Sequence, residues 1–415
     1  MKKQYDVLIV GGGVIGLACA HYLLIAGRKV CVIEKETLGS GASHGNCGLV
    51  FTSDLLPMCA PGAIRAEILR KIHGTTALYF KPIPDPGLLA WLLMFAGKCN
   101  RRHLQHAVSA RDSLLRHSRW LYDKLLADGR IHCDWAEKGI LMVYKDARLM
   151  EKYAGTNAIL EPYGLGASPV VGRELHALEP ALKYDVYGAW HHSADTHLRP
   201  DSLIKSWSTE LRNKGADIVE ECEVLSLEAT RGRITGALTS KGRYAFDTCV
   251  MAAGAWSPGL TRPLSIKLPI QPGKGYSITM SRPTPCPEIP CYFCERKVVA
   301  TPFSNGYRLG SIMEFSGFDL TLKRQRLAYL RRVAGEYLKS PVGDRVEEEW
   351  TSLRPMTYDD LPIIGPAPEH KNLFLATGHG MTGISMAPGT GKLIAELITG
   401  QAPHIDPAPY RVERF

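Results

Sequence analysis

Apolar residues near the N-terminus form blocks separated by glycines, in the order expected of a strand, a helix and a second strand. Residues 5–10 (YDVLIV) are apolar and favour a strand, and three glycines follow them. Residues 14–26 have the alanine and leucine content of a helix that ends at Gly27. Residues 29–33 are apolar again and lead to Glu34. The pattern predicts a βαβ unit at the start of the chain.

The α/β pattern returns in two later stretches. A helix that we expect Asp201 to cap and Gly215 to end precedes strands separated by the turns TRGR and SKGR. Residues 372–400 have the pattern of a strand, a glycine turn and a helix. Residues 57–119 are instead rich in Pro, Arg and His, and residues 263–308 show the Pro-rich alternation typical of an antiparallel sheet.

These blocks predict an α/β fold with a Rossmann-like nucleotide-binding domain that is discontinuous in sequence. An inserted α+β domain is expected on a mixed antiparallel sheet, with a helix over residues 320–338. The expected pieces of the nucleotide-binding domain are 1–56, 195–262 and 346–415, and those of the inserted domain are 57–194 and 263–345.

The bulk composition is that of an ordinary globular protein. The chain has 415 residues, of which 45% are hydrophobic and 22% charged, enough for a sizeable core. Its formal charge is +9, but no dense Lys/Arg run or aromatic-interleaved basic stripe occurs, which argues against a nucleic-acid partner. The first strand leaves no room for a signal peptide, and eleven cysteines suit reduced thiols, so we expect a cytosolic protein.

One apolar segment leaves a membrane contact open. No apolar run reaches the ~18–20 residues that a spanning helix needs. The longest is GLLAWLLMFAG at residues 87–97, which Lys98, Arg101, Arg102 and His103 follow. The segment 87–103 is either a buried helix of the fold or a patch for anionic headgroups. The second interpretation would place the protein peripherally on the inner face of the cytoplasmic membrane.

The glycine loop predicts a dinucleotide site. Gly11, Gly13 and Gly16 have the spacing that lets a chain turn sharply, approach a pyrophosphate and pack a helix on a strand. Glu34 ends the next strand, where its carboxylate would accept hydrogen bonds from ribose hydroxyls and repel a 2′-phosphate. The pattern therefore disfavours NADP and leaves FAD or NAD.

Three further stretches favour FAD, because a resident flavin needs contacts along its whole length. Residues 39–49 (GSGASHGNCGL) form a small-residue loop rich in hydrogen-bond donors. Residues 251–257 (MAAGAWS) bring small residues and a tryptophan beside the dinucleotide. Residues 376–383 (ATGHGMTG) aim a helix N-terminus at an acceptor, which in a flavin would be the N1–C2=O edge. The alternative for this last stretch is a plain strand-to-helix turn.

Several motifs in order along the chain resemble the FAD-dependent D-amino-acid dehydrogenases of the D-amino-acid oxidase superfamily. They are VGGGVIG at 10–16, GKGYSIT at 273–279, YRLGSIMEFSGFD at 307–319, LRPMTYDDLPIIG at 353–365 and ATGHGMTGISMAPGTGKLIAEL at 376–397. The resemblance implies oxidative deamination of a D-amino acid, including cyclic ones such as D-proline or hydroxy-D-proline, by hydride transfer from Cα to flavin N5. It also implies electron transfer to a respiratory quinone or another acceptor that is not oxygen.

Two other functions stay open beside this one. Relatives that act on sarcosine, glycine or opines share much of the pattern, and a flavin-containing electron-transfer subunit of a larger complex is the alternative of a different class. The residues expected to contact FAD are Gly11, Gly13, Val14, Ile15, Gly16, Glu34, Lys35, Ala42, Ser43, His44, Asn46, Gly48, Leu49, Val224, Ala253, Gly254, Trp256, Gly380, Met381 and Thr382. Either His44 or Cys47 could anchor FAD covalently, as in some relatives.

The family pattern points to Arg308 and Arg354 as cations for the substrate carboxylate, because a guanidinium fork matches a carboxylate. Tyr276 is expected to hydrogen-bond the same carboxylate, and His379 to contact flavin or substrate. The alternatives are a structural ion pair for each arginine, a core position for the tyrosine and a surface position for the histidine.

One departure from the family concerns the carboxylate contact. Some amino-acid oxidases of the superfamily carry an arginine near the position where Thr301 and Pro302 stand in this chain, which leaves the residue that makes the carboxylate contact open. Arg199 is a spare candidate that we expect to be exposed.

Three cysteines have the spacing of a plant-type two-iron cluster. They are Cys286, Cys291 and Cys294, and no fourth thiol follows nearby. The spacing is either a coincidence within ordinary strands, an iron–sulfur or zinc site, or a redox pair. We assign no metal ligand from the sequence.

Overall fold

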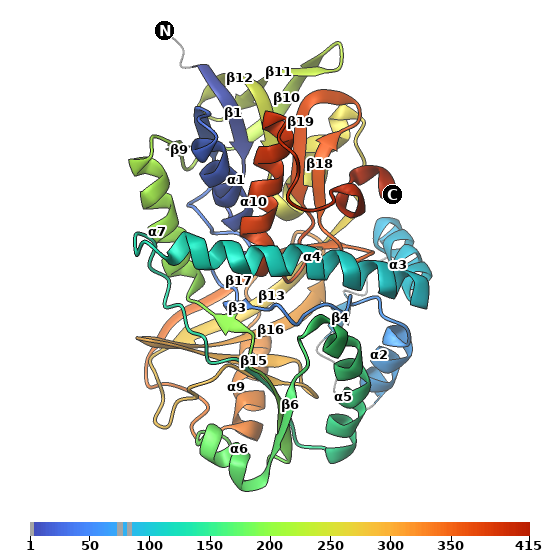
Figure 1. The fold of residues 1–415 in the computed structure, drawn as a ribbon, viewed down its shortest axis with the longest axis vertical. Coiled ribbons are helices and arrows are strands. Elements are labelled where there is room, and N and C mark those ends of the chain that lie inside the picture. The colour runs from blue at the N-terminus through green and yellow to red at the C-terminus, as the bar shows by residue number, and fades with distance from the viewer. Residues whose placement is uncertain (1–3, 73–77, 81–84) are drawn as a thin grey trace.

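Two β-sheets form the framework of the protein, and segments from both ends of the chain meet in the first of them (Figure 1). The structure is a computed structural model that describes residues 4–72, 78–80 and 85–415. The first sheet lies at the top of Figure 1 with both chain termini, and the second lies below the long helix that crosses the middle.

The first sheet has eight strands and a parallel centre. Its strands are β1 (Gln4–Val10), β2 (Val30–Ile33), β9 (Asp217–Val219), β10 (Val224–Thr230), β11 (Arg233–Thr239), β12 (Gly242–Met251), β18 (Ile363–Ala367) and β19 (His370–Thr377). Strand β1 pairs in parallel with β2 and β12, β2 with β9, and β12 with β19. The carboxyl ends of these strands therefore meet at one edge, where a doubly wound sheet binds its ligand.

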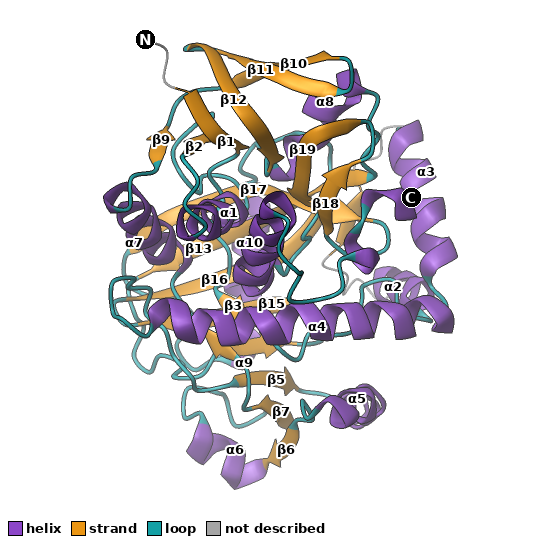
Figure 2. Cartoon of the chain, turned by 45° about the horizontal axis from the view of Figure 1, so that its top comes forward, coloured by secondary structure: helices purple, strands orange, loops and turns teal. Residues whose placement is uncertain are grey.

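Helices from distant parts of the chain cover this sheet (Figure 2). They are α1 (Val14–Ile25), α4 (Arg101–Leu126), α7 (Pro200–Asn213), α8 (Ser257–Thr261) and α10 (Gly383–Thr399). Close packing of α10 on α1 needs Gly391, because a Cβ there would collide with the backbone of Ala18. The expected cap at Asp201 is wrong, since α7 begins after Arg199 and Asp201 lies in its first turn.

The second sheet has nine strands in mixed orientation. They are β4 (Leu78–Phe80), β5 (Ile140–Tyr144), β6 (Ser168–Val171), β7 (Gly188–His192), β13 (Ile270–Met280), β14 (Cys291–Phe293), β15 (Val298–Phe303), β16 (Gly306–Phe315) and β17 (Val346–Thr357). Strand β13 pairs antiparallel with β16 and β17, while β14 pairs in parallel with β5. Helix α9 (Arg324–Tyr337) packs on this sheet and begins four residues later than expected.

Two expected domain boundaries do not coincide with the sheets. Strand β17 was expected in the nucleotide-binding piece 346–415, but it pairs with β13 in the second sheet. Helix α4 was expected in the inserted piece 57–194, but its Leu114 and Leu115 pack in the core of the first sheet with α10. Hydrophobic alternation alone does not show which sheet a strand or helix joins.

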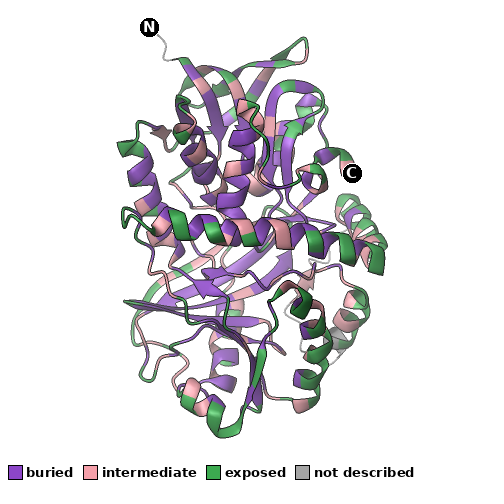
Figure 3. Ribbon diagram, viewed as in Figure 1, coloured by how far each residue is buried: buried purple, intermediate pink, exposed green. Residues whose placement is uncertain are grey.

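Residues buried around the two large sheets form the main cores (Figure 3). The shorter elements of the described chain are α2 (Ala63–Ile72), α3 (Pro86–Lys98), α5 (Ala147–Leu160), α6 (Gly172–Leu178), the two-stranded pair β3 (Leu49–Val50) with β8 (Thr196–His197), and five 3-10 turns (Glu161–Tyr163, Gly254–Trp256, Arg262–Leu264, Ala408–Tyr410, Val412–Arg414). Within residues 4–72, 78–80 and 85–415, no helix combines the length and hydropathy that crossing a membrane requires.

Candidate functional site

A cavity of ≈ 360 Å³ lies along the carboxyl edge of the first sheet and reaches β17 of the second. Residues from both ends of the chain line it, including the first glycine loop and the turn before α10. Most residues expected to contact FAD line this cavity: Gly11, Gly13, Val14, Ile15, Glu34, Lys35, Ala42, Ser43, Asn46, Val224, Ala253, Gly254, Trp256 and Gly380.

The glycine loop closes tightly around the start of α1. Gly11 has φ +110°, and a Cβ there would lie 2.5 Å from the carbonyl oxygen of Ala252. A Cβ on Gly16 would collide with the carbonyl oxygen of Gly11, so Gly16 serves helix packing and does not line the cavity. The backbone N–H of Gly12 donates to Oε2 of Glu34 at 2.7 Å. Burial raises the pKa of Glu34, and this hydrogen bond opposes the rise.

Two helix N-termini open onto the cavity. At α1, the N–H of Val14 donates to the Ser43 hydroxyl at 3.0 Å, and both residues line the cavity. At α10, the preceding Thr382 makes no side-chain cap, and Gly383 and Ile384 line the cavity. The first N–H groups of α10 therefore present partial positive charge to a bound group.

The remaining residues expected at FAD lie beside the cavity. Gly48 has φ +76°, and a Cβ there would collide with the carbonyl of Leu198. Leu49 pairs with His197 in the two-stranded sheet, and Nε2 of His44 lies 2.8 Å from a carboxylate oxygen of Glu348. Of the other two, Met381 is exposed, and the hydroxyl of Thr382 donates to the carbonyl of His379 at 3.3 Å.

Arg354 lies at the cavity wall without an acid partner. Its Nη1 donates to the carbonyl oxygen of Ile312 at 2.9 Å. Among the described residues, no carboxylate lies within ion-pair distance of this guanidinium, and burial lowers its pKa. A half-buried cation whose partners among the described residues are a neutral carbonyl and the Met313 thioether favours an anionic ligand.

Arg308, the other arginine expected at the substrate, lies outside the cavity lining and is only 1% exposed. Its guanidinium donates to the hydroxyl of Thr279 at 2.9 Å and to Asp201 at 3.3 Å. It also donates to the carbonyl oxygens of His44 and Asn46, at 3.0 and 2.7 Å. Each nitrogen of the Arg308 guanidinium thus has a protein acceptor. This arrangement matches the alternative of a structural ion pair and does not fit the expected contact with a substrate carboxylate.

The two other residues expected at the substrate differ in position. Tyr276 packs in the core of the second sheet beside Ile278, and its hydroxyl donates to Glu314 at 3.3 Å. His379 lines the cavity, with Nε2 2.9 Å from the hydroxyl of Thr390. Burial lowers the pKa of His379 to about 3, so its imidazole is neutral. Arg199, expected to be exposed, is instead 13% exposed and pairs with Asp201 at 2.9 Å.

Comparison with known families decides what this cavity holds. The family model of FAD-dependent oxidoreductases, named DAO, matches residues 6–397. This chain belongs to that family. The oxidoreductase is therefore FAD-dependent, and the expected fold class is confirmed.

Two relatives that match this FAD-dependent oxidoreductase over nearly their full length are named D-amino acid dehydrogenases. The D-amino acid dehydrogenase of Methylobacterium nodulans is 32% identical over 411 residues, covering 96% of each chain. The D-amino acid dehydrogenase 2 of Mesorhizobium japonicum is 31% identical over 412 residues, covering 97% of this chain and 98% of that protein.

Solved structures show the same fold. Glycine oxidase from Geobacillus kaustophilus superposes with a TM-score of 0.76 at 23% identity, covering 99% of each chain. L-Proline dehydrogenase from P. horikoshii gives a TM-score of 0.75 at 20% identity, covering 100% of this chain and 99% of that one. Identities this low establish the fold of the oxidoreductase alone.

The residues of the cavity fit FAD. The glycines leave no side chain between the first strand and a pyrophosphate, and the start of α1 faces the same space. Glu34 directly follows β2, where a ribose is expected, and Lys35 lies over the ring of Trp256 at 4.0 Å. The start of α10, beside Gly380, offers further donors to the cavity.

The three spaced cysteines do not converge in the oxidoreductase. Cys291 packs in the core between the second sheet and α9, whereas Cys294 belongs to a separate cluster with Tyr144. The described residues contain no group of three or more His, Cys, Asp or Glu side chains suited to a metal ion.

Sequence reasoning missed part of the cavity wall. Thr351, Ser352, Leu353 and Pro355 line it because β17 runs along the cavity edge. Their position next to Arg354 in LRPM was the available signal. The carbonyl of Ile312 could not be found from sequence, because its role depends on the backbone rather than on its side chain.

Proposed function

We propose that this FAD-dependent oxidoreductase oxidises D-amino acids at the Cα–N bond. The observation that carries the proposal is the guanidinium of Arg354, which lies in the wall of the FAD cavity and has no acid partner in the described part of the chain. The names of the full-length relatives support the D configuration, since both are called D-amino acid dehydrogenases.

Arg354 binds the substrate carboxylate. Its guanidinium presents a planar fork of donors, and only Nη1 has a hydrogen bond to the protein among the described contacts. A carboxylate held by this fork fixes the orientation of Cα toward the cavity. FAD supplies the two-electron acceptor when bound.

His379 contributes a neutral imidazole. Because its pKa is lowered to about 3, the side chain adds no positive charge to the cavity at neutral pH. It is held in place by Thr390, which fixes the ring beside the start of α10. The N–H donors at the start of α10 stabilise negative charge on the bound group. Since His379 is neutral, we assign the binding of the substrate carboxylate to the cation of Arg354.

The reaction removes a hydride from Cα and a proton from nitrogen, which leaves an imino acid. Water then hydrolyses the imino acid of a primary amine to a 2-oxo acid and ammonia. A cyclic secondary amine such as D-proline or hydroxy-D-proline fits the same chemistry. The two electrons pass to a respiratory quinone or another acceptor that is not oxygen.

Helix α3 supports a peripheral membrane contact for that electron transfer. Leu89 and Leu93, one turn apart, are 61% and 67% exposed, while Trp91 on the opposite face stacks on Phe95. The helix ends at Lys98, and exposed basic residues follow it: Arg101 and Arg102. An apolar stripe beside cations fits an anionic lipid surface, and we place the enzyme on the inner face of the cytoplasmic membrane.

A second candidate is the oxidation of N-substituted amino acids. The similar folds of glycine oxidase and of iminodiacetate oxidase from Chelativorans sp. BNC1 make this the alternative to test. Both kinds of substrate carry the carboxylate that Arg354 would bind, so the site geometry does not separate them.

Anaerobic reduction of the purified FAD enzyme tests the proposal. D-Alanine, D-proline and hydroxy-D-proline should bleach the flavin absorbance, and their L-enantiomers should not. Bleaching by sarcosine or iminodiacetate alone would favour the second candidate. Absence of bleaching by any of these amines would overturn both and support an electron-transfer subunit. Reoxidation of the reduced enzyme by a water-soluble quinone should be faster than reoxidation by dissolved oxygen.

A further inference from the structure

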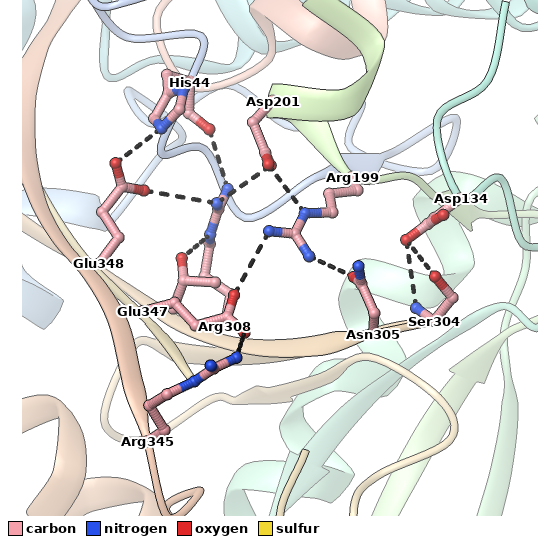
Figure 4. Close-up of polar contacts among 11 residues, drawn as sticks. His44, Asp134, Arg199, Asp201, Ser304, Asn305, Arg308, Arg345, Glu347 and Glu348 are labelled. Atoms are coloured by element: carbon pink, nitrogen blue, oxygen red, sulfur yellow. Dashed lines mark hydrogen bonds and ion pairs between the residues drawn. The ribbon is translucent and has the colours of Figure 1, made fainter. Parts of the chain in front are cut away.

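The second sheet holds a loop that lines the FAD cavity. We define the cofactor loop as residues 43–47, which follow α1 and β2 in sequence and belong to the first domain. Ser43 and Asn46 of this loop line the cavity. The contacts that hold the loop from behind come from β16 and β17 of the other sheet, as Figure 4 shows for Arg308 and Glu348.

Arg308 of β16 makes the central contact. Its Nη1 donates to two carbonyl oxygens of the cofactor loop, that of His44 at 3.0 Å and that of Asn46 at 2.7 Å. One guanidinium nitrogen thus fixes two carbonyls that are two residues apart. This contact determines the path of the loop between them.

Three further contacts from β16 and β17 hold the cofactor loop. The Nε2 of His44 lies 2.8 Å from Glu348 of β17. A Cβ on Gly45 would collide with the ring of Trp350, so the loop lies flat against that indole. Cys47 lies over Gly310 of β16, where a Cβ would come within 2.5 Å of its sulfur.

Acids from helix α7 and from strand β17 surround Arg308. Its Nη2 lies 3.3 Å from Asp201 at the start of α7 and 4.0 Å from Glu348. Asp201 also pairs with Arg199, whose Nη2 lies 3.6 Å from Glu347 (Figure 4). Because Arg308 is almost fully buried, these acids, the loop carbonyls and the Thr279 hydroxyl compensate for its lost hydration.

We propose that Arg308 is a positioning residue for FAD rather than a contact for the amino acid. It sets the cofactor loop so that Ser43 can receive the N–H of Val14 and Asn46 can face the cavity. The inference rests on the FAD dependence of the family and not on the identity of the amine. It assigns an arginine of the second domain to cofactor affinity.

The Arg308→Lys variant tests this assignment, with Arg296→Lys as the matched control. Arg296 also lies in the second domain, where it pairs with Glu336 at 2.8 Å and does not touch the cofactor loop. Lysine keeps the charge of Arg308 but cannot reach both loop carbonyls in a fixed plane. The Kd for FAD, measured by flavin fluorescence on addition to apoprotein, should rise about 10- to 100-fold in Arg308→Lys and stay within about twofold in the control.

The KM for the amine at saturating FAD distinguishes a role of Arg308 in positioning the cofactor loop from a role in substrate binding. At saturating FAD, Arg308→Lys should retain the wild-type KM for the amine within about threefold, because the loop is restored by the bound cofactor. Wild-type FAD affinity in Arg308→Lys would overturn the proposal. So would a KM that rises tenfold at saturating FAD, since that result would assign the arginine to the amine.

A second variant decides the case if Arg308→Lys does not fold. Gly45→Ala leaves the Arg308 side chain itself unchanged but forces the loop away from Trp350. It should weaken FAD at least tenfold, and the double variant Gly45→Ala/Trp350→Ala should recover most of the affinity because the clash is removed. Unchanged FAD affinity in Gly45→Ala would show that the position of the loop does not matter. Failure of the wild-type enzyme to oxidise any amine would leave these FAD affinities unaffected.

Discussion

The guanidinium of Arg354 crosses over Gly275 to donate a hydrogen bond to the carbonyl oxygen of Ile312 at 2.9 Å. Gly275 of β13 pairs with Ser352 of β17, so the arginine reaches from the edge strand β17 past β13 to β16. Ile312 and its neighbour Ser311 have φ +65° and +126°, an irregularity that turns this carbonyl toward the arginine. The contact holds the guanidinium without neutralising its charge, as the proposed binding of a substrate carboxylate requires.

Replacing Arg354 by lysine should weaken the enzyme for amino acids and not for FAD. The kcat/KM for a D-amino acid should fall about 100-fold, because the two-point contact with the carboxylate is lost. Stopped-flow reduction by a D-amino acid and by its amide measures the effect, since the wild-type preference for the acid should shrink in the variant. Arg326→Lys on α9 is the matched control, and an equal loss there would refute a specific role for Arg354.

Gly275→Ala should displace the guanidinium of Arg354. A Cβ at residue 275 would collide with the guanidinium, and the side chain would have to leave Ile312. We expect the KM for the amine to rise at least tenfold with FAD affinity unchanged. Gly335→Ala in α9 is the control, since a Cβ there meets only Pro341 at 3.8 Å. A variant with wild-type KM would mean that the position of the guanidinium does not limit binding.

The nucleotide site was largely predictable from the sequence because its chemistry is local. The spacing of the glycines and the position of Glu34 depend only on one strand, one turn and one helix. The residues of the site that come from the far end of the chain, such as Gly380, were found because they lie in a similar strand-to-helix turn. Local motifs of this kind need no knowledge of the other sheet.

The side-chain positions in the second sheet could not be predicted in the same way, because the face on which a side chain lies depends on the register of strand pairing. The pairing of β13 with β16 shifts between Lys274 and Tyr276, and Tyr276 then points into the core with Ile278. By residue type alone, Arg308 and Arg354 are equally plausible as the cation for a substrate carboxylate. The paired strands show that protein acceptors occupy the guanidinium of Arg308, whereas Arg354 uses only Nη1 for a backbone carbonyl. A shift of one residue inverts such an assignment.

Alanine at Gly13 and at Gly11 should separate FAD binding from folding. A Cβ on Gly13 would lie 3.2 Å from the Ser43 hydroxyl at the cavity wall, so Gly13→Ala should fold but bind FAD about tenfold more weakly. Gly11→Ala combines a positive φ with a contact of 2.5 Å to Ala252, and it should lower the melting temperature of the apoprotein itself.

Differential scanning fluorimetry of the apoproteins and FAD titrations distinguish these two effects. Gly155→Ala in α5 is the control, because nothing lies within 4 Å of a Cβ there. Equal FAD affinity in Gly13→Ala and wild type would contradict the placement of a pyrophosphate at the start of α1.

His379 should make the apoprotein sensitive to acid. Its pKa is about 3 in the folded state against 6.5 for a free imidazole, so the unfolded chain binds more protons between these values. Stability from this residue is therefore present above pH 6.5 and is lost as the pH falls, by about 1.4 kcal/mol per pH unit. Urea unfolding at pH 7.0 and 4.5 should show a smaller loss in His379→Asn than in wild type, by roughly 2–3 kcal/mol.

The exposed His106 of α4 supplies the control for this measurement. His106→Asn should lose as much stability between the two pH values as the wild type does. An equal loss in His379→Asn and wild type would mean that the imidazole of His379 is not held neutral by burial.

The outer face of α3 should bind the enzyme to anionic lipid. Glutamate at both Leu89 and Leu93 removes two exposed apolar side chains, each worth about 1.5–3 kcal/mol when buried in a hydrocarbon environment. The double variant should no longer sediment with phosphatidylglycerol vesicles, yet it should reduce an artificial soluble acceptor at the wild-type rate. Its reduction of a quinone embedded in those vesicles should fall at least tenfold. Leu149→Glu on α5, at a residue 44% exposed, controls for added charge. Wild-type enzyme that stays in the supernatant would refute the contact, whereas vesicle binding that survives in the double variant would place it on another surface.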